Sequence, residues 1–582
     1  MKICNKNIRA TALQEFWGDD YRESVYLWEG AKHKLTLSEM DQLTDDTLRD
    51  LFAGPDEIVS AGEYCKDVYH RILPKLTDTL NRISEVRLPE FFWRTAFGYW
   101  LFRHICITYE KYAYLSEIDV DRTSVKLLSK EAFYVPYDHV DYLYCFCNDF
   151  GVQQLVSQYY YLFARKEFAS LALPFSFTRG TGTLDRFKDI ARKTIKFPGK
   201  LLRNLATNGT PNVVLCGVFC TPEVYSASVS QSQGKVSSLV PPPVKTDRFV
   251  DEALRAKLLG IEHQDDFEYF LVQTLYYCLP QRFVERFRGS YDRYLKDIKG
   301  RTFTHIVSEN WISDISSSLY VATAQNEGRT FVSHEHGSGM VFDRTFPNWI
   351  DMEAADRYLT VGWSIDNSKV IPGGFICRDT KTYEPKPAKK GILYIARTNF
   401  PYLMEFSIYN VPNTKSVNAL KRIRRVFELL PASLSGHFVF RPRKEELLLD
   451  TEHALETASN NITVDRGDFS QSIANARIVI VDHLSTGSAE IVLRKIPCLL
   501  IQDQEPIPAI LEEMNEIFEQ LKICGVMHDS AESAVSHLTV IYDNVAEWWN
   551  SEAVQAAVNR LVSATLAPPQ KTIDYLVSCR TL

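Results

Sequence analysis

The sequence of 582 residues has no apolar run long enough to span a membrane. Its longest apolar stretch, residues 91–108, contains Arg94, Arg103 and His104, which are costly within a bilayer. The opening MKICNKNIRATALQEFW spreads charges through the region where a secretory signal would be apolar. We therefore expect a cytoplasmic protein with at most a peripheral membrane contact.

Metal-binding and disulfide patterns are also missing. The twelve cysteines are scattered without any Cys-x-x-Cys, and their closest pairs are Cys145/Cys147 and Cys216/Cys220. A zinc framework would repeat such pairs, and a core this large needs no disulfide bonds. We expect small buried cysteines in a reducing compartment.

The chain has no excess of positive charge. Its 66 Lys and Arg and 73 Asp and Glu give a net charge of −7, which argues against duplex nucleic acid as a partner. With 45% hydrophobic and 24% charged residues, the composition is that of a folded globular protein.

The sequence does contain a regular alternation of short apolar runs and longer amphipathic segments, which is typical of α/β folds with parallel sheets. In the first part we predict strands at 25–28, 213–219, 305–308, 330–333, 358–361 and 370–372. In the last part we predict strands at 391–396, 437–441, 462–464, 477–481 and 498–501. The Pro/Lys-rich stretch 382–390 indicates a linker. We thus predict one lobe over 1–378, with an aromatic-rich helical insertion at about 57–168, and a second lobe over 390–582.

Between two such lobes, ligands bind at the carboxyl ends of the strands. Small residues follow the strand at 477–481, where a helix is predicted to start: Ser485, Thr486, Gly487 and Ser488. Free backbone N–H groups and hydroxyls at a helix start suit a nucleotide phosphate. Glu490 follows one to two turns later, where a carboxylate can accept hydrogen bonds from ribose. The alternative is an ordinary helix cap with Glu490 on the helix surface.

The strand at 330–333 runs into His334-Glu335-His336 and a Gly/Ser loop. Histidine titrates near neutral pH and burial can tune a glutamate, so we predict His336 first, then Glu335 and Asp343, as base or nucleophile. Two histidines so close need a third ligand to hold zinc, and no Asp-x-Asp stands at a predicted strand end. We therefore predict no metal and no cofactor.

Two arginines end strands of the second lobe. Arg397 follows the strand at 391–396, and Arg441 closes the strand at 437–441. Guanidinium groups match phosphate oxygens, so we predict that both bind the same ligand. The alternative for each is a solvated surface arginine.

Residues 179–205 carry eight Lys and Arg against two Asp, with apolar residues between them. In an acidic protein such a segment indicates contact with a membrane surface or a lipid-linked pyrophosphate. A solvated loop is the alternative.

The spacing Ser485-Thr486-x-x-x-Glu490, followed by Pro497, resembles the C-terminal-lobe motif of GT-B glycosyltransferases. That family usually has glycine where this chain has Lys495. The resemblance implies a GT-B-like α/β fold of two Rossmann-type lobes, with the donor phosphates held at this loop.

A second similarity extends over nearly the whole chain. Its matching segments are 9–13, 16–17, 26–30, 92–94, 98–101, His336-Gly337, Asp356 and Gly362-Trp363. They resemble transferases of bacterial O-antigen and surface-carbohydrate clusters, related to capsule ulosonate transferases. This resemblance implies sugar transfer from a nucleotide donor, first a CMP-linked ulosonic-type sugar, to a lipid-linked or polysaccharide acceptor at the inner membrane. Glu335 and Ser338 differ from that family's usual residues, which leaves the identity of the base open.

Three other functions stay open at this point. A CDP-alditol phosphotransferase uses a similar His-Gly loop and would place phosphate in the polymer. A non-catalytic scaffold of glycan assembly would tolerate His336→Ala. A GT-B-shaped sugar-nucleotide epimerase would need an acid and a base on both sides of the sugar.

Overall fold

The computed structural model describes residues 2–18, 23–43, 46–174, 211–244, 247–309, 315–338, 340–345, 348–378, 380–382, 391–397, 400–407, 413–443, 449–457, 459–502 and 509–579. The basic segment predicted at 179–205 and residues 383–390 of the predicted linker lie outside them. In the described part of the chain, no helix has both the length and the apolar character needed to cross a bilayer.

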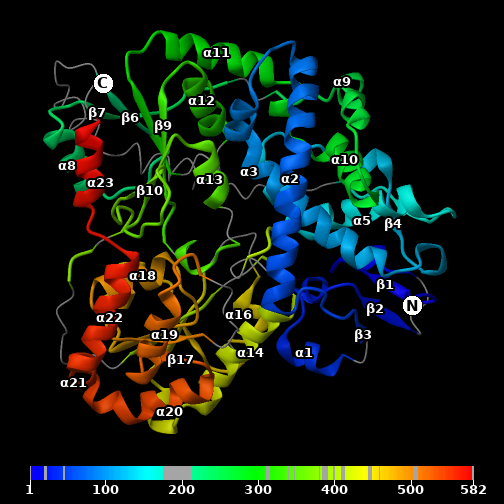
Figure 1. Cartoon of the computed structure of the whole chain (residues 1–582). Coiled ribbons are helices and arrows are strands. Elements are labelled where there is room, and N and C mark those ends of the chain that lie inside the picture. The colour runs from blue at the N-terminus through cyan, green and yellow to red at the C-terminus, as the bar shows by residue number, and fades with distance from the viewer. Residues whose placement is uncertain are drawn as a thin grey trace.

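The N-terminal lobe is built on a six-stranded parallel sheet (Figure 1). Its strands are β6 (Val213–Cys216), β7 (Val236–Leu239), β8 (His305–Ser308), β9 (Thr330–His334), β10 (Arg357–Thr360) and β11 (Val370–Pro372), in the order β11-β10-β9-β8-β6-β7. The neighbouring helices are α8 (Pro222–Gln231), α11 (Phe287–Lys299), α12 (Ile315–Asn326) and α13 (Asn348–Ala354). The strands are mostly short apolar runs, as expected where helices cover both faces of a parallel sheet.

The C-terminal lobe repeats this architecture. Its strands are β12 (Ile392–Ile395), β13 (Phe438–Arg441), β14 (Thr463–Val464), β15 (Ile478–Val481), β16 (Cys498–Ile501) and β17 (Met527–His528), all parallel in the order β14-β13-β12-β15-β16-β17. Its helices are α14 (Asn413–Leu429), α15 (Ala432–Ser435), α16 (Thr451–Ala454), α17 (Phe469–Asn475), α18 (Thr486–Leu493), α19 (Met514–Ile523), α20 (Ala531–Ile541), α21 (Val545–Trp549) and α22 (Glu552–Thr565). Lys495, after α18, has a φ of +56°, which explains why glycine suits this position.

A helical insertion packs beside the N-terminal lobe (Figure 1). Its helices are α2 (Pro55–Ser84), α3 (Glu90–Ser116), α4 (His139–Phe146) and α5 (Asp149–Phe163), joined later in the chain by α9 (Glu252–Ala256) and α10 (Asp266–Cys278). Helix α3 is buried on nearly all sides, with Trp93 and Trp100 fully enclosed. A helix that is apolar all round belongs in the interior of a protein.

A small sheet precedes the insertion. It joins β1 (Asn7–Arg9), β2 (Ser24–Tyr26) and β3 (Asp46–Thr47), and α1 (Leu37–Gln42) lies between the last two. The strand predicted at 25–28 is therefore real, but it belongs to this sheet and not to that of the N-terminal lobe.

The last helix returns from one lobe to the other. After α22, α23 (Gln570–Ser578) packs against α8, and Leu576 joins the core of the N-terminal sheet with Val213 and Leu359. Two Rossmann-type lobes, a crossing C-terminal helix and a large helical insertion confirm the predicted GT-B-like fold.

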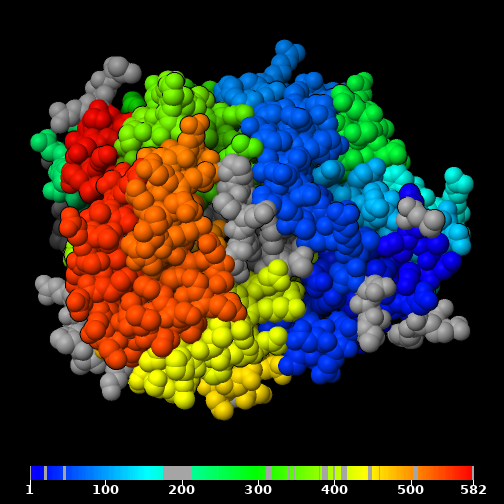
Figure 2. Space-filling view, turned by 60° about the horizontal axis from the view of Figure 1, so that its bottom comes forward, coloured from blue at the N-terminus to red at the C-terminus, as the bar shows by residue number. Residues whose placement is uncertain are grey.

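The loop after β12 leaves the C-terminal lobe and enters the insertion. The Tyr402 hydroxyl donates to Asp149, and Arg103 pairs with the buried Glu405 at 3.0 Å. Phe406 packs against Phe52 with ring centroids 4.8 Å apart. Figure 2 shows the yellow surface of the C-terminal lobe against the blue N-terminal residues. The C-terminal lobe is thus joined to the insertion and to the segment before it.

Candidate active site

The two lobes touch where the loop after β9 meets the start of α18. The Ser338 N–H donates to the Thr486 hydroxyl at 3.2 Å. Gly337 has a φ of +76°, and a Cβ there would lie 2.2 Å from the Thr486 Oγ1. Only glycine allows this approach. The predicted His-Gly loop and the predicted phosphate loop therefore lie side by side.

His336 lies in the same loop, directly before Gly337. The side chain is 50% exposed, and its Nδ1 lies 3.3 Å from Oε1 of the fully buried Glu309. The other carboxylate oxygen of Glu309 accepts the N–H of Phe219 at 2.8 Å, and the ring of Phe219 meets the imidazole edge-on at 5.8 Å. Among the described residues, none makes a hydrogen bond to this Oε1, so its contact with the imidazole is one of proximity. The predictions missed Glu309, although a carboxylate directly after a buried strand was a readable signal.

Glu490 lies on α18 one turn beyond Thr486, on the same face of the helix. Its Oε1 accepts hydrogen bonds from Ser470 at 2.8 Å and Arg494 at 3.0 Å. Among the described residues, none donates to its buried Oε2, and Nε of the half-exposed Arg378 lies 4.0 Å away. One oxygen of this buried carboxylate is thus without a hydrogen-bond partner among the described residues, and donor binding by Glu490 stays a prediction.

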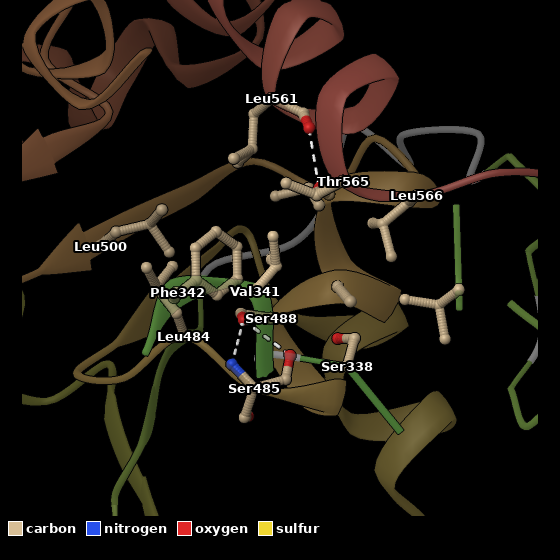
Figure 3. Close-up of a pocket in the computed structure, with 13 residues that line it drawn as sticks. Ser338, Val341, Phe342, Leu484, Ser485, Ser488, Leu500, Leu561, Thr565 and Leu566 are labelled. Atoms are coloured by element: carbon tan, nitrogen blue, oxygen red, sulfur yellow. Dashed lines mark hydrogen bonds between the residues drawn. The ribbon is translucent and has the colours of Figure 1, made fainter. Parts of the chain in front are cut away.

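The small residues at the start of α18 cap the helix. The Ser485 hydroxyl accepts from the Gly487 N–H at 3.3 Å, while the Ser485 N–H donates to the Ser488 hydroxyl at 2.7 Å. Ser485 and Ser488 also line an apolar pocket together with Val341, Phe342 and Leu561 (Figure 3). Its volume of about 20 Å³ has room for about one water molecule. The pocket is therefore too small for a nucleotide.

A model of the LIC12162 family of transferases matches residues 6–569. The chain belongs to this transferase family. No curated protein sequence matches it. Among solved structures, the glycotransferase of kitacinnamycin has a TM-score of 0.34 at 10% identity, covering 64% of this chain and 100% of its own. MurG of Acinetobacter baumannii has a TM-score of 0.33 at 12% identity, covering 63% and 99%.

The other two predicted catalytic carboxylates of this LIC12162 family transferase face other partners. Glu335 is buried, and its Oε2 accepts the Val361 N–H at 3.0 Å and the Trp363 indole N–H at 2.7 Å. Burial raises the pKa of Glu335 to about 8. Asp343 is also buried, and its Oδ1 accepts both the N–H and the hydroxyl of Thr345, at 2.8 and 2.6 Å. Among the described residues, neither carboxylate is hydrogen-bonded to His336 or to Glu309.

The strand-end arginines lie in two settings. The backbone N–H of Arg397 donates to Asp482 at 2.6 Å, which joins the ends of β12 and β15. Arg441 donates to Asp465, to the Ser472 hydroxyl at 3.1 Å and to a backbone carbonyl in the same turn. Much of the hydrogen-bonding capacity of Arg441 is thus used within its own lobe, and phosphate binding by either arginine stays a prediction.

Asp482 fastens the ends of the central strands of the transferase's second lobe. Burial alone would raise its pKa, but the hydrogen bond from His483 and the charge of Arg422 outweigh burial and lower the pKa to about 2. In the described ranges, no group of three His, Cys, Asp or Glu side chains is placed to hold a metal ion. Metal independence stays a prediction.

Proposed function

We propose that this transferase moves a sugar from a nucleotide donor to an acceptor hydroxyl, with His336 as the general base. The observation that carries the proposal is the half-exposed imidazole of His336, whose Nδ1 lies 3.3 Å from the buried Glu309 carboxylate, beside the contact between the two lobes. A general base must be accessible to the acceptor hydroxyl, and a partner on its other side helps to fix its orientation. The exposure of His336 and its proximity to Glu309 support this role.

In the proposed reaction, His336 Nε2 accepts the proton of the acceptor hydroxyl as its oxygen attacks the anomeric carbon. The bond between that carbon and the donor phosphate breaks, and the nucleotide leaves with the electron pair. Negative charge then grows on the phosphate near the start of α18, where the helix dipole is positive. The imidazolium that forms is stabilised by the Glu309 carboxylate beside it.

For the donor, we infer that the open oxygen of Glu490 accepts a ribose hydroxyl and that Arg378 faces a phosphate. Arg397 and Arg441 are further phosphate contacts in this proposal. A CMP-linked ulosonic-type sugar is the first donor to test. The acceptor we propose is a lipid-linked or polysaccharide chain of a bacterial surface glycan such as O-antigen or capsule.

The first test measures the thermal stability of the protein with CMP, CDP, UDP, GDP and ADP, each with and without magnesium. A nucleotide at about 100 times its Kd should add roughly 2.7 kcal/mol to the free energy of unfolding. The shift should disappear in Glu490→Ala and persist in Glu547→Ala, on the short helix α21 away from the cleft. No shift with any nucleotide contradicts the proposal and favours a scaffold role.

The second test measures sugar transfer from the nucleotide sugars that bind. His336→Ala should abolish transfer, whereas His70→Ala, at another partly exposed histidine on α2, should leave it unchanged. Transfer that survives in His336→Ala excludes this residue as the base. Labelled donor phosphate found in the product identifies phosphotransfer instead.

A further inference from the structure

The chain crosses from α22 back to α23 directly over the turn that follows β10. The Ala567 N–H donates to the Val361 carbonyl at 2.8 Å, and the Phe375 N–H donates to the Ala567 carbonyl at 2.9 Å. Gly362, between these contacts, has a φ of +152°, and a Cβ there would lie 2.3 Å from the Leu566 carbonyl carbon. Backbone therefore packs on backbone, and only glycine fits the turn.

Glu335 holds the same turn from inside the N-terminal lobe. Its Oε2 accepts both the Val361 N–H and the Trp363 indole N–H. Its own N–H donates to the Leu359 carbonyl at 2.8 Å, so its backbone and side chain are both fixed. These hydrogen bonds, from donors of fixed geometry to one buried carboxyl group, hold the turn rigidly against Glu335.

His334, one residue earlier, is fixed to the crossing helix itself. Its Nε2 lies 3.2 Å from the Thr572 hydroxyl on α23, and that hydroxyl also accepts the Gly374 N–H at 2.8 Å. His334 is buried, whereas His336 is half exposed. His334 thus contacts the crossing helix directly, and Glu335 is linked to the crossing segment through the turn at Gly362.

We propose that Glu335 is a positioning residue, which ties the backbone of His336 to the crossing segment through the turn at Gly362. A movement of one lobe against the other then displaces His336, because the contacts of Glu335 link its backbone to the crossing segment. The proposal rests on the role of His336 proposed above. It assigns Glu335 no contact with substrate.

The test removes one hydrogen bond and keeps the carboxyl group. Trp363→Phe removes the indole N–H, and Trp349→Phe, at a tryptophan of α13 that packs against Tyr69 of α2, is the control. We expect kcat to fall about 10- to 100-fold in Trp363→Phe with the donor KM unchanged, because small displacements of a base cost that much. Trp349→Phe should keep the wild-type kcat. Equal kcat values in the two variants overturn the proposal.

A second readout needs no catalytic activity. Diethyl pyrocarbonate modifies exposed histidines, and peptide mass spectrometry gives the rate for His336 relative to His70 in the same sample. We expect the relative rate to rise severalfold in Trp363→Phe and in Glu335→Ala, and to return to the wild-type value in Glu335→Gln. Glutamine keeps an acceptor oxygen for both donors. An unchanged rate in Trp363→Phe and Glu335→Ala overturns the proposal even if the wild-type protein transfers no sugar.

Discussion

Glu309 and Glu335 invite comparison because they are so alike at first sight. Both are buried glutamates that directly follow neighbouring parallel strands, β8 and β9, at the same edge of one sheet. Each accepts a backbone N–H through Oε2. The remaining partner differs: Glu309 faces the imidazole of His336, and Glu335 faces the indole of Trp363.

The partner of a buried glutamate determines what it can do. An imidazole can accept a proton during a reaction, so a glutamate beside it can take part in proton transfer. An indole N–H keeps its proton, so Glu335 exchanges no proton with Trp363. Proximity to the histidine in sequence is therefore a poor guide, since Glu335 is its direct neighbour and Glu309 is not.

The largest effect should follow from Glu309→Gln. Glutamine keeps the shape of the side chain but cannot stabilise the imidazolium of His336, so we expect kcat to fall roughly 10²- to 10⁴-fold. Steady-state kinetics with a donor that binds gives this value. Glu327→Gln, at a carboxylate paired with Lys299 on the surface, is the control and should act as wild type. A loss below about threefold would remove Glu309 from the mechanism.

The second prediction concerns pH and Glu335. Burial raises its pKa from 4.5 to about 8, so between these values the folded protein keeps a proton that the unfolded chain releases. The stability of the wild type therefore falls as pH rises from 4.5 to 8, by up to about 1.4 kcal/mol per pH unit. Glu335→Gln lacks this loss. Its stability relative to the wild type, from denaturant unfolding, should rise between pH 5 and 8, and a constant difference would contradict the raised pKa.

The third prediction concerns Asp482, whose pKa is lowered where that of Glu335 is raised. Its pKa of about 2 lies below the ordinary value of 3.8, so its ionised form stabilises the fold above pH 4 and this contribution is lost as pH falls towards 2. Asp482→Asn should cost about 2 kcal/mol at pH 7 and almost nothing near pH 2. The same denaturation series, extended to acid pH, measures both. A cost independent of pH would mean that the charge of Asp482 contributes little.

The smallest effect is expected from the backbone conformation of Lys495, and its test changes no carboxylate. Lys495 takes a left-handed φ of +56°, which costs a non-glycine residue roughly 1 kcal/mol. Lys495→Gly should raise the melting temperature slightly, and Lys495→Ala, which keeps the strain, should not. Equal melting temperatures for the two variants would show that the turn is unstrained.

Much of this architecture could be predicted from apolar periodicity. The strands at 305–308, 370–372 and 498–501 have the predicted bounds, and α18 begins one residue after the predicted start of that helix. Strand β7 was missed because its centre is Ser237-Ser238, which gives no apolar run. The return of α23 to the first lobe was missed because an amphipathic helix does not reveal which lobe it covers.

The candidate site was harder to predict. Sequence patterns predicted that His336, Thr486 and Glu490 face one cleft, since strand ends and helix starts are visible in the sequence. They could not show that Glu335 faces a turn near Trp363 or that Glu309 faces His336. Those directions depend on contacts between segments about 30 residues apart, which no local pattern encodes.

The crossing helix also bears on how the protein is synthesised. Leu576 fills the core of a sheet whose first strand, β6, leaves the ribosome long before it. Throughout that interval the growing first lobe exposes the apolar surface that α23 will cover, and such surface attracts chaperones. A chain cut before α23 would therefore keep the strands of both lobes and still leave the core of the N-terminal sheet open.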